Sequence, residues 1–191
     1  MGGLPPDGGG LDAETGEELS QGLNSVLNRL YEQAIRTDPL CWQAAWLQGR
    51  LFLDGHNEAS AVPELQRALQ INPQAAEVLV TQGRADLEGY KLAAGRSKVE
   101  SALAINPEMA TAYVLLADLN ISDERYAEAR DAAKKALAIN PKHAGALGRL
   151  AAAYRLLVEP EKALAVEAAA RADNPKPATF YTALGERLAD R

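Results

Sequence analysis

Residues 102–141 read ALAINPEMATAYVLLADLNISDERYAEARDAAKKALAINP, and this segment begins and ends with the same letters, ALAINP, 34 residues apart. The same interval separates five prolines: Pro39, Pro73, Pro107, Pro141 and Pro175. The letters that lead into these prolines repeat as well, reading RTDP, QINP, AINP, AINP and ADNP. A fixed period of this length is typical of stacked helical hairpins. The sequence therefore predicts a helical repeat protein.

The composition suits closely packed helices. Of the 191 residues, 47% are hydrophobic but only 5% are aromatic, and alanine supplies much of the apolar content. A formal net charge of -6 argues against general affinity for nucleic acid, whose phosphates require a basic surface. Cys41 is the only cysteine, which excludes an internal disulfide and a thiolate zinc cluster, and we interpret it as a small buried thiol.

Targeting and membrane signals are not visible in the sequence. No stretch approaches the roughly 18 consecutive apolar residues that a membrane span needs. Residues 1–10 carry glycine and proline where a secretory signal has a basic end followed by an apolar run. We therefore expect a cytoplasmic protein without a membrane span.

Alignment on the prolines brings small residues into two columns. One column holds Gly49, Gly83, Ala117, Ala151 and Gly185, and the other holds Ala34, Ala68, Ala102, Ala136 and Ala170. A small side chain at one recurring point lets two helices approach to roughly 8–10 Å between their axes. The columns therefore predict where neighbouring helices cross.

Each repeat is predicted to contain two helices. Residues Trp42–Asp54 are apolar in helical spacing and run into Gly55, and glycine is common just past the C-terminus of a helix. The second helix ends at the Asn-Pro pair, because proline cannot continue the hydrogen-bond ladder. We expect Pro63 and Pro160 in the first turn of a second helix, where a missing N–H group costs nothing.

In its period, its small-residue columns and its terminal proline, the sequence from Trp42 to Arg191 resembles the tetratricopeptide repeat family. The resemblance implies an all-α fold, a right-handed superhelical solenoid of antiparallel helix pairs. It also implies that the first helix of each pair lines the concave face. The four full repeats would be Trp42–Ala75, Ala76–Met109, Ala110–His143 and Ala144–Pro177.

The two ends complete the predicted organisation. Thr15 and Glu18 fit a capping box, and an apolar stripe follows, so we expect one N-terminal helix over 16–36 that packs on the first repeat. The predicted domains are a flexible segment at 1–15, an N-terminal helix and connector that form a half-repeat or cap at 16–41, the four repeats at 42–177, and a C-terminal capping or truncated-repeat helix at 178–191.

Three residues depart from the family pattern. Gly95 occupies a column that otherwise holds alanine, and Asp86 and Asn120 occupy a position where the family often has an aromatic residue. A glycine inside a helix costs up to about 1 kcal/mol relative to alanine. The second repeat is therefore predicted to be the least stable one.

The sequence offers little for catalysis. His56 and His143 fall in separate connectors, and neither a glycine-rich phosphate motif nor a metal-spaced Cys/His cluster is present. We therefore expect a non-enzymatic protein without catalytic residues, cofactor or metal.

Following the family pattern residue by residue places a groove on the first helices. The predicted partner-binding residues are Trp46, Leu47, Arg50, Val80, Thr81, Arg84, Val114, Leu115, Asp118 and Arg149. Two interpretations of Arg50 and Arg84 remain open. They form ion pairs with neighbouring carboxylates such as Asp54, Asp86 or Glu88, or they contact an acidic peptide. In the second case Trp46 would supply an apolar anchor, although it could equally pack against the N-terminal helix.

Three functions are compatible with these features. The leading hypothesis is a protein–protein interaction scaffold that binds a peptide or partner segment, acidic or apolar, in the groove. The alternatives are a self-assembly module that stacks through the ends of the solenoid and an accessory segment of a larger enzyme. Neither nucleic acid nor a membrane is an expected partner.

Overall fold

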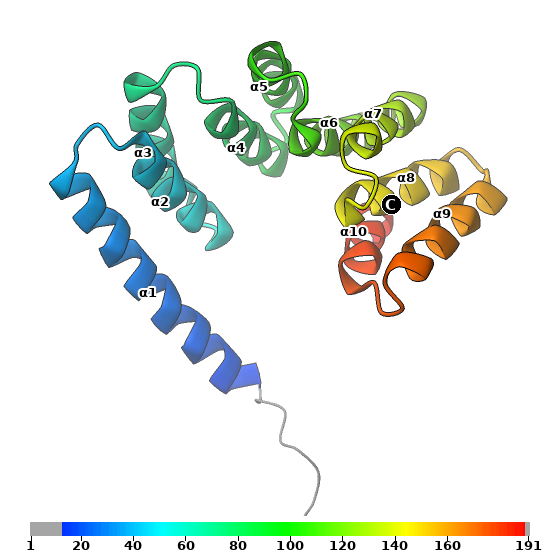
Figure 1. The fold of residues 1–191 in the computed structure, drawn as a ribbon, viewed down its shortest axis with the longest axis horizontal. Coiled ribbons are helices and arrows are strands. Elements are labelled where there is room, and N and C mark those ends of the chain that lie inside the picture. The colour runs from blue at the N-terminus through cyan, green and yellow to red at the C-terminus, as the bar shows by residue number, and fades with distance from the viewer. Residues whose placement is uncertain (1–12, 190–191) are drawn as a thin grey trace, which may run out of the picture. The chain divides into compact units, whose positions relative to one another are not determined.

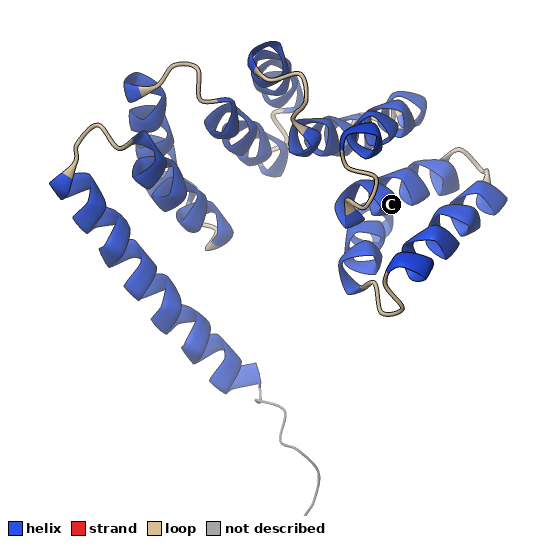
Figure 2. Cartoon of the chain, viewed as in Figure 1, coloured by secondary structure: helices blue, strands red, loops and turns tan. Residues whose placement is uncertain are grey.

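The computed structural model describes the backbone of residues 13–189 and, within that range, the side chains of residues 22–186 and of Leu188. Every element in this part of the chain is an α-helix (Figure 1), and Figure 2 shows loops as the connections between them. The helices are α1 (Ala13–Thr37), α2 (Trp42–Asp54), α3 (Glu58–Ile71), α4 (Ala76–Glu88), α5 (Leu92–Ile105), α6 (Ala110–Ser122), α7 (Tyr126–Ile139), α8 (Ala144–Leu156), α9 (Pro160–Asp173) and α10 (Ala178–Ala189). The predicted all-α fold built from helix pairs is confirmed.

The N-terminal helix begins earlier than the capping box indicated. Helix α1 starts at Ala13, so residues 13–15 of the predicted flexible segment are helical. Residues 1–12 of that segment lie outside the described residues.

Cys41 is partly exposed, which contradicts its interpretation as a buried thiol.

The chain divides into two compact units. Unit 1 is Met1–Pro73 and contains α1 to α3, and unit 2 is Gln74–Arg191 and contains α4 to α10. The boundary lies two residues before the end of the first predicted repeat. In unit 1, α2 packs against both α1 and α3, and in unit 2 each first helix packs on its second helix, while α8 also packs on α10.

Small residues set the distance between the two helices of a repeat. A Cβ atom added to Gly49 of α2 would lie 2.8 Å from Cδ2 of Leu65 in α3. A Cβ atom added to Gly83 of α4 would lie 3.2 Å from the carbonyl oxygen of Gly95 in α5, and one added to Gly95 would lie 3.0 Å from the carbonyl oxygen of Gly83. Glycine at both positions lets the α4 and α5 backbones approach closely, and this contact is a reason for glycine at position 95 inside a helix.

The core of unit 2 is built mainly from alanine, with a few larger side chains between the helices. Phe180, Leu119 and Val99 are fully buried. Asn120 is an exception, since it is 2% exposed and its Oδ1 atom has no hydrogen-bond partner among the described residues. The equivalent position in the fourth repeat holds the buried Tyr154. Asn120 therefore lacks the aromatic packing that a tyrosine provides at this position.

The first helix of each repeat ends in the same turn. The second residue after the helix has a positive φ in all four repeats: His56 (54°), Tyr90 (55°), Glu124 (58°) and Val158 (60°). In the first of these turns the N–H of His56 donates to the carbonyl of Leu53, and the N–H of Asn57 donates to that of Phe52, which is a Schellman motif. Gly55 has a φ of -91°, so the glycine at the helix end is not the left-handed residue. The left-handed position carries a side chain each time, at a cost of about 1–2 kcal/mol.

The expectation for Pro160 is confirmed and that for Pro63 is wrong. Pro160 is the first residue of α9. Pro63 lies inside α3, beyond its first turn, where its ring nitrogen cannot donate to the carbonyl of Ala59. Both Pro63 and Ala59 are exposed, so water can hydrogen-bond to that carbonyl and the helix continues.

We expect Val158→Gly to raise the free energy of unfolding by about 1 kcal/mol, because glycine relieves the left-handed strain of a β-branched residue. Val158 is 84% exposed, so little packing is lost. Urea unfolding followed by circular dichroism measures the change. Gly55→Ala is the control and should not destabilise the protein, because its φ is ordinary and the nearest atom to the new Cβ is 3.6 Å away. A lower stability of the Val158 variant would contradict the assignment of strain.

Candidate functional site

The first helices of the repeats in unit 2 lie next to one another. Helix α4 contacts α6, and α6 contacts α8. Within this unit the structure therefore brings together most of the predicted groove residues, which are Val80, Thr81 and Arg84 on α4, Val114, Leu115 and Asp118 on α6, and Arg149 on α8. We refer to this set as the inner-helix surface.

Burial separates these residues into two groups. Thr81, Leu115 and Asp118 are only 7%, 6% and 5% exposed. The hydroxyl of Thr81 donates to the carbonyl of Glu77 at 2.8 Å, and Leu115 belongs to a core cluster between the helices. These residues are buried between the helices and expose little surface area for contact with a partner.

Val80, Val114, Arg84 and Arg149 are the half-buried members of the inner-helix surface. Val80 and Val114 are one repeat apart, so they occupy the same position on adjacent helices. Arg84 approaches Glu88 on the same helix, with its Nε atom 3.6 Å from the carboxylate, and the two side chains are 37% and 49% exposed. Ion pairs this exposed contribute about 0–1 kcal/mol, so the pair with Glu88 holds Arg84 only weakly.

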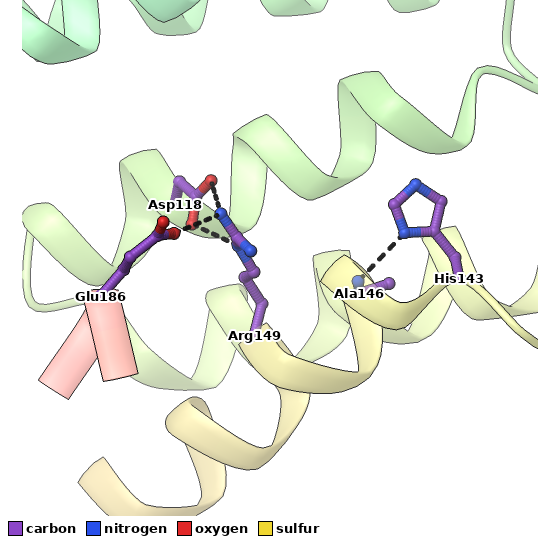
Figure 3. Close-up of polar contacts among 5 residues, drawn as sticks. All are labelled: Asp118, His143, Ala146, Arg149 and Glu186. Atoms are coloured by element: carbon purple, nitrogen blue, oxygen red, sulfur yellow. Dashed lines mark hydrogen bonds and ion pairs between the residues drawn. The ribbon is translucent and has the colours of Figure 1, made fainter. Parts of the chain in front are cut away.

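Arg149 forms a nearly buried ion pair with Asp118 (Figure 3). Its Nε and Nη2 atoms donate to the two carboxylate oxygens of Asp118 at 2.9 and 3.2 Å, and Nη2 lies 3.6 Å from the carboxylate of Glu186 on α10. The Arg149 and Asp118 side chains are 12% and 7% exposed, whereas Glu186 is 51% exposed. A bidentate pair of this kind fixes the orientation of both side chains and neutralises both charges.

The sequence reasoning placed Arg149 and Asp118 in the groove but missed their pairing. The sequence feature that could have indicated this pairing is the opposite charge of Asp118 and Arg149, which lie on the first helices of consecutive repeats. Asp118 lies near the end of α6 and Arg149 near the middle of α8, 31 residues further along. The pair ties two first helices together, and Glu186 extends the network to a third.

His143 has a structural task at the start of α8. Its Nδ1 atom accepts a hydrogen bond from the backbone N–H of Ala146 at 3.2 Å, which caps the helix (Figure 3). His56 belongs to a turn of the other unit and occupies the left-handed position there. Within the described part of the chain, no group of three or more His, Cys, Asp or Glu side chains is placed to hold a metal ion.

Unit 1 carries the other three predicted residues, Trp46, Leu47 and Arg50, on α2. The guanidinium carbon of Arg50 lies 5.2 Å from the centroid of the Trp46 ring, a cation–π contact. The Trp46 ring also lies 6.2 Å from that of Trp42. Arg50 is exposed and both tryptophans are half-buried, so α2 presents an aromatic and cationic cluster of its own.

None of the helices among residues 13–189 combines the length and the apolar character needed to span a bilayer.

Comparison with known proteins identifies a family of repeat proteins. A family model described as Tetratricopeptide repeat matches residues 28–76 and 80–144, more than half of the chain. No curated protein matches the sequence significantly.

Among solved structures, that of the MamA protein is similar with a TM-score of 0.63 and 21% identity, over 86% of this chain and 90% of that one. TTC0263, a thermophilic TPR protein from Thermus thermophilus, gives a TM-score of 0.70 with 19% identity over 91% of this chain and 94% of that one. A chain of the APC/C hetero-tetramer Cut9-Hcn1 gives a TM-score of 0.73 with 16% identity, over 87% of this chain and 33% of that one. At these identities the likeness concerns the fold alone.

Removing Arg149 should destabilise unit 2 strongly. We expect Arg149→Leu to cost about 3 kcal/mol of unfolding free energy, because it leaves the carboxylate of Asp118 buried without its arginine. Adding Asp118→Leu should recover part of that loss, since no buried charge is then unpaired. Urea denaturation of the two single variants and the double variant measures the coupling.

Arg125→Leu is the matched control for this cycle, because it removes an exposed pair with Glu128. It should change stability by less than about 0.5 kcal/mol. Additive losses in the cycle would show that the Arg149–Asp118 pair does not act as a unit.

Proposed function

Because this chain belongs to the tetratricopeptide repeat family, whose members generally mediate protein–protein interactions, we propose that it is an interaction scaffold whose unit 2 binds an extended partner segment on the inner-helix surface. The observation that carries the proposal is that the half-buried Val80 and Val114 hold equivalent positions on the contacting helices α4 and α6, with the partly exposed Arg84 one turn after Val80. Proteins of this family are typically non-enzymatic, and the proposed activity is binding without catalysis.

The proposed partner segment combines apolar and acidic side chains. Val80 and Val114 are equivalent positions of consecutive repeats, so they offer two apolar contacts in a row. Arg84 is 37% exposed on the same helix as Val80, four residues further along, and its positive charge would attract an acidic side chain of the partner. Arginine beside apolar area is a frequent combination at binding hot spots.

The charges around Arg149 and Glu186, on α8 and α10, favour one orientation of the partner segment along the inner-helix surface. Arg149 is already neutralised by Asp118, and the exposed Glu186 adds negative charge beside it. An acidic residue of the partner would be repelled there and attracted at Arg84. The proposal therefore places the acidic end of the segment at α4 and a neutral or basic end at α8 and α10.

Trp46 and Arg50 of unit 1 form a second proposed contact. The guanidinium of Arg50 stacked over the Trp46 ring presents a cation and an apolar face together. Leu47, half-buried on the same helix, adds apolar area.

A peptide library sorted by charge tests the proposal. Peptides with two apolar residues and an acidic flank should bind the purified chain, and Arg84→Glu should weaken that binding at least tenfold in fluorescence polarisation, because attraction becomes repulsion. Arg50→Glu, measured separately, reports on unit 1.

Lys134→Glu is the matched control, since it makes the same charge change at an exposed position on α7, a second helix. It should leave binding unchanged. Equal affinity of the Arg84 variant and the unmodified chain for every peptide would refute the inner-helix surface as the binding site.

A further inference from the structure

Unit 2 contains a cavity of about 350 Å³ that is lined by α8, α9, α10 and the connectors leading into α8 and α10. Helix α8 packs against both α9 and α10, which lie beside it in Figure 1. Ligand pockets in proteins have volumes of roughly 300–1,000 Å³, so the cavity is at the lower end of that range. It is large enough for one side chain of a partner.

The buried part of the cavity is apolar, and its exposed part carries charge. Ala170 and Phe180 are 4% and 0% exposed, and the half-buried Leu147 packs against the same core cluster. Lys142 and Asp173 line the exposed part and form an ion pair there. Their side chains are 74% and 43% exposed, so they form a polar rim around apolar walls.

The third repeat has an aromatic ring at the equivalent position. Leu147 of α8 and Ala169 of α9 both line the cavity, and the residues one period before them are Tyr113 and Lys135. The Nζ atom of Lys135 on α7 lies 5.6 Å from the centroid of the Tyr113 ring on α6, a cation–π contact. The third repeat therefore places a ring and an ammonium group where the fourth repeat has smaller side chains and a cavity.

Phe180 compensates for these smaller side chains only in part. It stands one period after Ala146 and is fully buried, with its ring 5.1 Å from that of Tyr181 in an edge-to-face arrangement. The cavity remains beside it, and Phe180 forms one of the walls. All the residues compared lie between 107 and 181, and the ring in the third repeat comes from the first helix of that same repeat.

We propose that this cavity binds an aromatic side chain of a partner protein, whose ring takes the place that the Tyr113 ring has in the third repeat. The apolar walls bury the ring, and the ammonium of Lys142 at the rim attracts its face, as Lys135 does on Tyr113. A leucine side chain fills the cavity without gaining that attraction, so the site distinguishes aromatic from aliphatic residues. The lining residues differ from those of the inner-helix surface, so this contact is separate from the proposed function.

Two short peptides that differ in one side chain test the proposal. The acetylated and amidated tripeptides Gly-Tyr-Gly and Gly-Leu-Gly are titrated into the full chain, and backbone amide signals are followed by NMR. We expect the tyrosine peptide to shift the signals of cavity residues such as Ala144, Leu147 and Thr179. The leucine peptide should bind about threefold more weakly, the factor that corresponds to a cation–π contact at an exposed site.

Two variants close the cavity from different helices. Ala169→Trp on α9 and Thr179→Trp on α10 place a large side chain at exposed positions of the lining, so both should fold and both should abolish the shifts. Ala172→Trp and Thr182→Trp are the matched controls, because they make the same changes at exposed positions of the same helices outside the lining. Both controls should bind like the unmodified chain, and circular dichroism confirms that each variant is folded.

The inner-helix surface is tested independently, because Arg84→Glu should leave the shifts at the cavity unchanged. Equal binding of the two peptides overturns the proposed preference for an aromatic ring. Cavity signals that do not move with the tyrosine peptide, or shifts that survive both Ala169→Trp and Thr179→Trp, overturn the site itself.

Discussion

The close approach of two helix backbones at the small-residue column is the contact on which the rest of the structure depends. At Gly49 and Gly83 an added Cβ atom would lie only 2.8 and 3.2 Å from atoms of the second helix. This crossing fixes how each pair is built, and the 34-residue period repeats it. In unit 2 the consequence is that α4, α6 and α8 become neighbours although each is separated in sequence by a whole second helix.

That arrangement decides which charges are available to a partner. Arg84 and Arg149 are both arginines on first helices, but they differ in what surrounds them. Arg149 is almost buried and bound by both oxygens of Asp118, so its charge is used to join α6 to α8. Arg84 is 37% exposed, with its Nε atom 3.6 Å from the Glu88 carboxylate on the same helix, and the proposed recognition of acidic groups uses this exposed part of its guanidinium.

Differences between equivalent positions are informative because every repeat serves as a reference for the others. Tyr113 and Lys135 place a ring and an ammonium group in the third repeat where Leu147 and Ala169 line a cavity in the fourth. Asn120 is buried with no described partner for Oδ1 where Tyr154 packs in the fourth repeat. At Asn120 the deviation means that a polar group is kept in the core against its desolvation cost.

The sequence by itself determined the period, the helix pairs and the columns, because proline, glycine and alanine act through the backbone within a few residues. It also placed Asp118 and Arg149 on the inner helices. Only the tertiary structure decided that these two pair, that Thr81 and Leu115 are buried, and that Pro63 is tolerated inside α3. Burial and ion pairing depend on distances between residues that are far apart in the chain, and a period gives the order of the helices without giving those distances.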